Sequence, residues 1–313
     1  NHYIRALTSE GYTQEFFIEG GRSRTGKMLP PKIGLLGSYM EAMADRIVQD
    51  IVVVPVYIAY ERVVEDYSAE LAGAEKKKES AGELVKASSV LRRRFGRIYV
   101  KTNEPISLKE SMEILDSPWR ELSEDDRKDY LKRFAHHVVA EIQDVTVVTP
   151  SSVVAVALLG HDRRGITRAR FHRRCLFLRS WLDARGALFS DAWQFPDDAL
   201  DETIELFASE RWVELLPEPE GGADGADDIL AIAVDAGPRM QMDYYRNSIL
   251  FHFVPAAFLC TSVVLGVDDT ESLVTVRRRF EVLVDLFQEE FFFHPDLPTE
   301  FLLRQAGRRL QEL

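Results

Sequence analysis

The residues best suited to chemistry lie in one short glycine-rich stretch near the start of the chain. It reads Glu19-Gly20-Gly21-Arg22-Ser23-Arg24-Thr25-Gly26-Lys27. Each arginine can present a planar fork to phosphate oxygens, and the crowding of three cations favours an anionic partner. The carboxylate of Glu19 can orient the arginines or accept hydrogen bonds from hydroxyl groups. A small phosphorylated, hydroxylated ligand would use all of these groups together.

Two other interpretations of this stretch stay open. One is a solvated polar turn whose arginines pair with surface acids. The other is a nucleotide-binding P-loop, because Gly21 to Lys27 has its spacing. However, Met28 follows where magnesium needs a hydroxyl, and Pro30 and Pro31 oppose the helix that should come next. The P-loop interpretation predicts magnesium-dependent nucleotide binding that is lost on Lys27→Ala.

The neighbouring segments must position the loop. Residues 15–19 form a short apolar run suited to a buried strand, and residues 20–34 hold glycines and a proline pair that predict a loop. Residues 35–47 have apolar side chains at helical spacing. Residues 51–58 are β-branched and apolar on both faces, as in a parallel strand covered on each side. This order predicts a βαβ crossover and therefore an α/β sheet.

The rest of the chain is predicted to be mostly helical. A polar segment around Pro118 suggests a domain boundary, which gives domains 1–118 and 119–313. Besides a strand at 97–101, a loop at 217–228 and a short strand at 229–234, we expect helices over residues 61–97, 152–159, 169–182 and 199–209.

Residues 249–267 admit two interpretations. This stretch has His252 as its only ionisable group and approaches the length of a membrane span. Pro255 and Gly266 interrupt it. It is either a buried helix of a helical domain or a segment that enters a membrane.

Composition excludes several classes of protein. With 46% hydrophobic and 29% charged residues, the chain is a folded globular protein. A net charge of −12 argues against nucleic acid as a partner. Only Cys175 and Cys260 are present, which argues against a disulfide scaffold or a structural zinc site, and we expect no metal and no cofactor. The chain begins at Asn1 without an initiator Met, so we expect a truncated N-terminus.

The glycine-rich stretch and the apolar segment at residues 52–58 resemble motifs of the glycerol-3-phosphate acyltransferases, especially the large bacterial membrane-associated type. Residues 17–27 are similar to the family's third motif, whose core is Glu-Gly-x-Arg-Ser-Arg. Residues 52–58 are similar to its fourth motif, a hydrophobic strand with a central proline, here Pro55. Further likeness is found at residues 59–63, 76–80 and 244–247.

The resemblance implies an enzyme that transfers an acyl group from acyl-CoA or acyl carrier protein to the 1-hydroxyl of sn-glycerol 3-phosphate. The implied fold is a partial acyltransferase sheet with flanking helices, followed by a mostly helical C-terminal domain. Pro55 and Val56 are implied to line the acyl chain's pocket. The residues implied to form the glycerol 3-phosphate site are Glu19, Gly20, Gly21, Arg22, Ser23, Arg24 and Lys27.

The sequence departs from the family at its first motif, His-x-x-x-x-Asp, which holds the general base. None of the seven histidines is followed five residues later by Asp, so no catalytic residue is assigned. A missing base costs roughly a hundred- to ten-thousand-fold in rate, and we expect this chain alone to be inactive. We also expect exposed apolar sheet edges and poor solubility, because strands contributed upstream would be missing. His136 and His137 are interpreted as surface or packing residues.

The implied location is the cytoplasmic side of the inner membrane, with the lipid surface as a partner. Two basic clusters, residues 92–97 and 163–174, either face that membrane or are solvated helix faces. Lys76, Lys77 and Lys78 are a solvated helix face or contact the substrate. Two alternative functions remain: acylation of dihydroxyacetone phosphate, and a non-catalytic module that binds phosphate or lipid.

Overall fold

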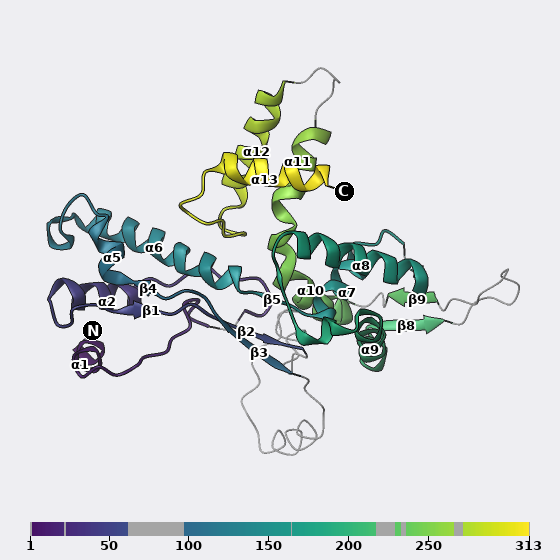
Figure 1. Cartoon of the computed structure of the whole chain (residues 1–313), viewed down its shortest axis with the longest axis horizontal. Helices are drawn as coiled ribbons and strands as arrows, with labels where there is room; N and C mark the ends of the chain where they lie inside the picture. Colours follow the sequence, from purple (N-terminus) through teal and green to yellow (C-terminus); the bar gives the residue numbers. More distant parts are fainter. Residues whose placement is uncertain are drawn as a thin grey trace, which may run out of the picture.

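The computed structural model describes residues 2–21, 23–61, 97–163, 165–216, 229–232, 236–265 and 272–312. It shows a mixed α/β protein with small sheets and a mostly helical C-terminal part, as predicted. The elements fall into three groups (Figure 1). The buried side chains form three clusters, one in each group. The predicted helix at 61–97 and the loop at 217–228 lie almost wholly outside the described residues.

The first group surrounds the long helix α6. Its elements are α1 (His2–Ser9), α2 (Gly34–Ala44), β1 (Val52–Val53), β4 (Ile106–Ser107), α5 (Leu108–Glu113), η1 (Trp119–Glu121) and α6 (Glu124–Asp144). Helix α6 begins where the Ser123 hydroxyl accepts a hydrogen bond from the Asp126 N–H, and acidic residues fill its first turn. Its apolar face packs on α2 through Leu36, Met40 and Phe134. The proposed division at residue 118 stays a prediction.

A two-stranded ribbon extends from this group. Strands β2 (Val56–Tyr60) and β3 (Ile98–Thr102) pair antiparallel along their whole length, with Val56 opposite Thr102 and Tyr60 opposite Ile98. Pro55 separates β1 from β2, because it has no N–H to donate, while its carbonyl accepts a bond from Asn103.

The predicted parallel βαβ crossover is wrong. Strand β1 pairs antiparallel with β4, and β2 pairs antiparallel with β3. The predicted strand at residues 15–19 is absent. Phe16 packs instead on the Tyr39 ring of α2, with 5.9 Å between the ring centroids, and so is covered without a neighbouring strand. The helix predicted at 35–47 is correct and is α2.

The predicted cover on both faces of residues 51–58 is also wrong. Side chains that alternate along β1, β2 and β3 are exposed on one face: Val52, Val54, Val56, Ile58, Tyr60, Ile98 and Val100. A two-stranded ribbon has two faces and packs only one of them on the described part of the chain. This exposed apolar surface is a face of the ribbon, and the expectation of exposed apolar edges stays a prediction.

The second group is a helical core with small sheets at its edge. Its helices are α7 (Pro150–Leu159), α8 (Arg168–Ala184), α9 (Pro196–Ser209) and α10 (Ala236–Ile249), with η2 (Asp191–Gln194). Strand β5 (Val147–Val148) pairs parallel with β7 (Leu188–Phe189), while β9 (Ile229–Ile232) lies between β6 (Gly165–Thr167) and β8 (Val213–Leu216). The helices predicted at 152–159, 169–182 and 199–209 are therefore correct.

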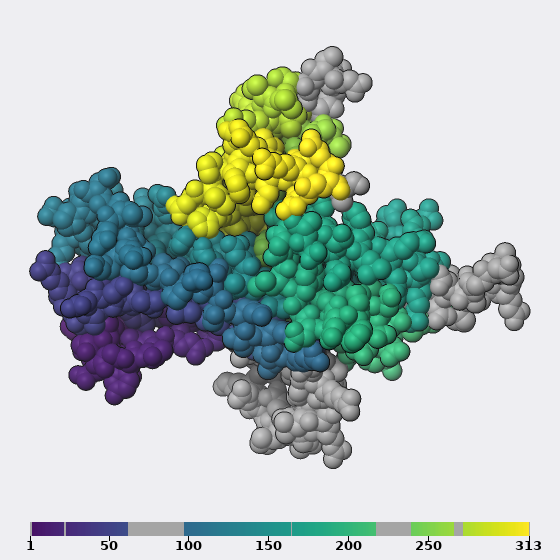
Figure 2. All heavy atoms as spheres, viewed as in Figure 1, coloured from purple at the N-terminus to yellow at the C-terminus, as the bar shows by residue number. Residues whose placement is uncertain are grey.

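The third group is a helical lobe that stands above the junction of the other two (Figure 2). It consists of η3 (Leu250–His252), α11 (Val254–Val264), α12 (Leu273–Phe287) and α13 (Thr299–Gln311). Phe292 leaves this lobe and is buried in the first group's core, whereas Phe291 and Phe293 pack in the lobe. The segment between α12 and α13 thus ties the lobe to α6.

The apolar stretch at 249–267 is bent rather than continuous. In the described part of the chain no single helix is long and apolar enough to span a membrane, and one pair broken by a 76° bend, 239–252 with 254–264, passes by length and composition together. Pro255 occupies the first turn of α11, where its missing N–H costs no hydrogen bond. Val254 and Phe258 are buried, whereas Val263 and Val264 at the far end are exposed.

Candidate functional site

The glycine-rich stretch forms a closed loop. At its base the Lys32 N–H donates to the Ile18 carbonyl at 2.7 Å. One step inside, the Leu29 N–H donates to Oε2 of Glu19, also at 2.7 Å. These two bonds bring the two ends of the loop together. Glu19 therefore has a structural role that its position in the motif does not reveal.

Two glycines allow this path. Gly20 and Gly26 have φ angles of 71° and 78°, in the left-handed region that side chains disfavour. At Gly26 a Cβ atom would lie 2.0 Å from the carbonyl oxygen of Tyr244, so no other residue fits without moving backbone. Gly21 differs, because a Cβ there would meet nothing within 4 Å.

The far side of the loop is fastened to helix α10. Nδ2 of Asn247 donates to the carbonyl of Thr25 at 2.8 Å, one residue before the close approach of Gly26 to Tyr244. Asn247 itself is buried. The loop of the first group is thus shaped by a helix of the second group, more than two hundred residues later in the sequence.

Carboxylate and phenol groups meet beneath the loop. Burial raises the pKa of Glu19, and the bond from Leu29 partly offsets this. Burial, with smaller contributions from Tyr244 and Glu19, raises the pKa of Tyr57 well above its ordinary value, and a hydrogen bond with Thr146 acts in the opposite direction. Tyr57 therefore keeps its proton at neutral pH.

The predicted phosphate-binding residues differ in what the structure says of them. The Ser23 hydroxyl is buried and has no hydrogen-bond partner in the described residues. Such an atom calls for a partner, and a bound ligand is one. Arg24 is exposed, and Arg22 lies outside the described residues. Their convergence on one anion stays a prediction.

Lys27 faces a different part of the molecule. Its ammonium group pairs with Glu290 and lies 5.3 Å from the centre of the Phe291 ring. Beside it is a small cavity of about 40 Å³, lined among others by Tyr57, Gln143 and Asn247. In this arrangement Lys27 connects the loop to the segment between α12 and α13.

Comparison with known proteins places this geometry in a family. A family model described as the glycerol-3-phosphate acyltransferase C-terminal region matches residues 67–312, and an acyltransferase model matches residues 1–59. The chain belongs to the glycerol-3-phosphate acyltransferase family. The glycine-rich loop lies in the part matched by the acyltransferase model, and Tyr244, Asn247 and Glu290 lie in the C-terminal region.

Curated relatives in several pseudomonads carry the family's name. The glycerol-3-phosphate acyltransferase of Pseudomonas putida strain GB-1 is 33% identical over 321 residues, which cover 100% of this chain and 36% of the relative. Those of Pseudomonas paraeruginosa and Pseudomonas fluorescens are each 34% identical over 269 residues, covering 83% of this chain and 31% of theirs. The chain spans about a third of the length of these acyltransferases.

The two residues predicted for the acyl pocket lie at the start of the ribbon. Pro55 is buried, and its carbonyl accepts the Asn103 N–H at 3.0 Å. Val56 is exposed and belongs to the open apolar face, whereas the next residue, Tyr57, faces the glycine-rich loop. The ribbon therefore places a polar group at the loop and apolar groups on the opposite side.

Sequence reasoning missed Tyr57, Thr146 and Glu290 as neighbours of the loop. Residues 244–247 were noted only as part of the family resemblance, and they supply the contacts of Tyr244 and Asn247. The alternation of the ribbon could have placed Tyr57 opposite Val56. No local signal points to Glu290, which reaches Lys27 from 263 residues away.

Proposed function

We propose that the loop from Glu19 to Lys27 binds sn-glycerol 3-phosphate, and that this chain takes part in acylating its 1-hydroxyl. The observation that carries the proposal is the buried Ser23 hydroxyl without a partner in the described residues, set between two arginines of a closed loop. Arg22, Arg24 and Ser23 would hold the phosphate. The second oxygen of Glu19, beside the one bonded to Leu29, would accept a glycerol hydroxyl.

The proposed reaction takes an acyl group from acyl-CoA or acyl carrier protein. The 1-hydroxyl oxygen attacks the thioester carbonyl, the carbon–sulfur bond breaks, and the hydroxyl proton ends on the departing thiol. A general base must carry that proton, and residues 1–313 hold no His-x-x-x-x-Asp motif. The proposed share of this chain is therefore to bind and orient the acceptor, and no cofactor is invoked.

The exposed apolar surfaces support a lipid partner. The open ribbon face with Val56 is our proposed wall for the acyl chain. At the tip of the third group, Val264, Leu273 and Val274 are respectively 80%, 86% and 73% exposed. Amphiphilic donors and products would meet such surfaces at a bilayer, and we place this contact at the cytoplasmic side of the inner membrane.

Calorimetric titration of purified residues 1–313 tests the acceptor site. We expect saturable binding of sn-glycerol 3-phosphate, weaker binding of inorganic phosphate and none of glycerol. Arg24→Ala removes a charge-assisted contact and should weaken binding roughly tenfold or more. Lys128→Ala is the control for loss of an exposed cation, because Lys128 lies on α6, outside the loop.

The outcome separates the alternatives. Dihydroxyacetone phosphate bound tenfold tighter than sn-glycerol 3-phosphate would favour that acceptor instead. Equal binding of inorganic phosphate and glycerol 3-phosphate would leave only a phosphate-binding module. If wild-type protein and Arg24→Ala bind identically, the loop is not the phosphate site.

A further inference from the structure

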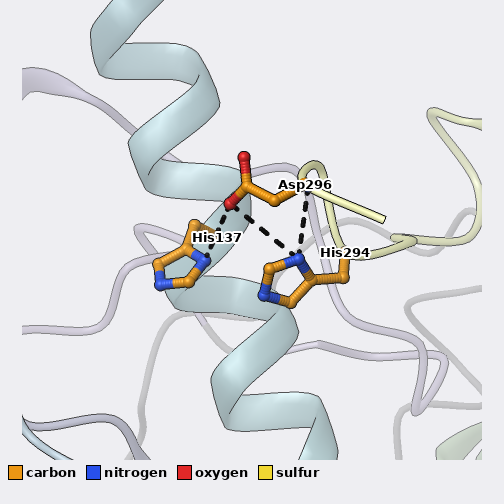
Figure 3. A group of neighbouring side chains, drawn as sticks. All are labelled: His137, His294 and Asp296. Carbon is orange, nitrogen blue, oxygen red and sulfur yellow. Dashed lines mark hydrogen bonds and ion pairs between the residues drawn. The ribbon is translucent and has the colours of Figure 1, made fainter. Parts of the chain in front are cut away.

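Two histidines and an aspartate from distant parts of the sequence meet beside helix α6. His137 lies on α6, whereas His294 and Asp296 come from the segment between α12 and α13 (Figure 3). Oδ2 of Asp296 lies 3.6 Å from Nδ1 of His137 and 3.9 Å from Nδ1 of His294. One donor atom of each residue lies within 4.8 Å of the other two.

We propose that His137, His294 and Asp296 bind one divalent transition-metal ion, for which Zn²⁺ is the best match. Two imidazoles and a carboxylate are donors that zinc accepts readily, and a water molecule would complete a tetrahedron. Bonds of about 2.0–2.1 Å in a tetrahedron need donor atoms roughly 3.4 Å apart. The two separations from Asp296, 3.6 and 3.9 Å, are close to this value. All donor atoms lie within 4.8 Å of one another, so the two histidines must move closer together to bind one ion.

The two histidines differ in the hydrogen bonding of the nitrogen atoms that face Asp296. Nδ1 of His137 is buried and has no hydrogen-bond partner in the described part of the chain. In His294 the backbone N–H of Asp296 donates to Nδ1 at 3.2 Å, while Nε2 lies 3.5 Å from the Glu141 carboxylate. These two neighbours favour a proton on Nε2 and a lone pair on Nδ1. In this structure that lone pair accepts the Asp296 N–H, so binding of an ion requires the His294 ring to turn away from this N–H.

A second set of contacts steadies the donors. Glu141, behind His294, accepts two hydrogen bonds from Asn103, at 2.7 Å to Oε2 and 2.9 Å to its backbone carbonyl. Arg133 binds Oδ1 of Asp296 at 2.5 Å, which leaves Oδ2 turned toward the histidines. Carboxylates that orient metal-bound histidines in this way are a general feature of zinc sites.

The ion would fasten the C-terminal lobe to the rest of the molecule. His294 follows two residues after Phe292, which is buried against α6, and four residues after Glu290, the partner of Lys27. Holding His294 and Asp296 on α6 would therefore fix the segment between α12 and α13, which the glycine-rich loop contacts through Lys27 and Glu290. We assign the ion a positioning role rather than a part in chemistry.

Zinc titration of chelator-treated residues 1–313 tests the site by calorimetry, with absorption of the Co²⁺-loaded protein as a second readout. We expect one Zn²⁺ per chain and a rise in the unfolding midpoint. His294→Ala and Asp296→Asn should each weaken zinc binding tenfold or more. Circular dichroism establishes that each variant is folded, and Asp296→Asn keeps the shape of the side chain.

His172→Ala is the matched control. His172 also lies on a helix between two carboxylates, but Asp197 is 3.4 Å from Nδ1 and Asp201 is 2.9 Å from Nε2, on opposite sides of the ring. It should bind zinc like the wild-type chain. Absence of saturable zinc binding by the wild-type chain, or unchanged binding by both folded site variants, would overturn the proposal and leave a simple ion-pair cluster. Neither result depends on glycerol 3-phosphate, so this proposal can fail independently.

Discussion

The helical core of α7–α10 and the β2–β3 ribbon are both built from apolar sequence, but they bury it differently. In α7 every residue from Pro150 to Ala155 is buried, because other elements pack around the helix on all sides. In the ribbon, alternate side chains such as Ile58 and Val100 stay exposed. A helix inside a bundle has neighbours all round, whereas a two-stranded sheet has a second face that needs its own cover.

The glycine-rich loop lies where these two regions meet. Its base belongs to the first group, its far side rests on α10, and Tyr57 of the ribbon lies beneath it. The closed core gives the loop a rigid support, and the open face leaves room for an apolar partner. In the function we propose, this difference would divide two tasks: the supported loop would hold a small polar acceptor, and the open face would meet lipid.

The largest test of this contrast compares Phe207→Ala with Val56→Ala. Phe207 is fully buried in the helical core, and its ring packs edge-to-face with that of Trp212 at 4.9 Å between centroids. Its truncation should therefore cost about 3–5 kcal/mol of unfolding free energy. Val56 is exposed, and its truncation should cost less than about 1 kcal/mol. Urea denaturation of both variants measures this. A comparable loss at Val56 would mean that the ribbon face is covered.

Replacing glycines tests whether the loop depends on the core. Gly26→Ala forces a left-handed residue and a Cβ against the Tyr244 carbonyl, so it should destabilise the chain by about 2 kcal/mol or more. The same change at Gly21 should cost under about 0.5 kcal/mol. Thermal unfolding of the two variants checks the difference. Equal midpoints would show that α10 does not hold the loop.

His252 predicts how acid acts on the buried 3-10 turn η3 that follows α10. Burial, together with the nearby Arg185, lowers its pKa to about 3. When the pH is below the unfolded-state pKa of His252, about 6.5, the unfolded chain binds a proton at this residue and the folded chain does not. Stability is therefore present above that pH and is lost as pH falls, by about 2 kcal/mol between pH 7.5 and 5.

His252→Leu isolates this contribution, because burial also lowers the pKa of His136 and acts in the same direction. The variant should lose less stability than the wild type over the same pH range in parallel urea titrations. Identical pH dependence in the two proteins would show that His252 is protonated without penalty in the folded state.

Local pattern was sufficient for part of this structure. The spacing of apolar residues predicted α2, α7, α8 and α9, and the glycines with Pro30 and Pro31 predicted the loop. These features depend on neighbours within a few residues. The partly exposed ribbon was not predictable, because strand partners and sheet cover are decided by residues far along the chain.

The candidate sites show the same limit. The motif from Glu19 to Lys27 could be read directly, but its contacts with Asn247 and Glu290 required the folded chain. His137 was interpreted as a surface or packing residue, since its partner His294 lies 157 positions later, too far for any spacing rule. Sequence thus predicted the residues of one candidate site, which stay a prediction, and missed the proposed metal site entirely.

The smallest expected effect concerns the tip of the C-terminal lobe, where exposed apolar residues lie on helices rather than on the β2–β3 ribbon. Flotation of the protein with phosphatidylethanolamine and phosphatidylglycerol vesicles measures its affinity for lipid. Leu273→Asp should weaken partitioning about fivefold, corresponding to roughly 1 kcal/mol of lost apolar burial. Ile114→Asp, at a 79% exposed site at the end of α5, is the matched control and should leave partitioning unchanged. Equal losses in the two variants would mean that vesicles bind any exposed apolar residue, and the lobe would then have no special role at the membrane.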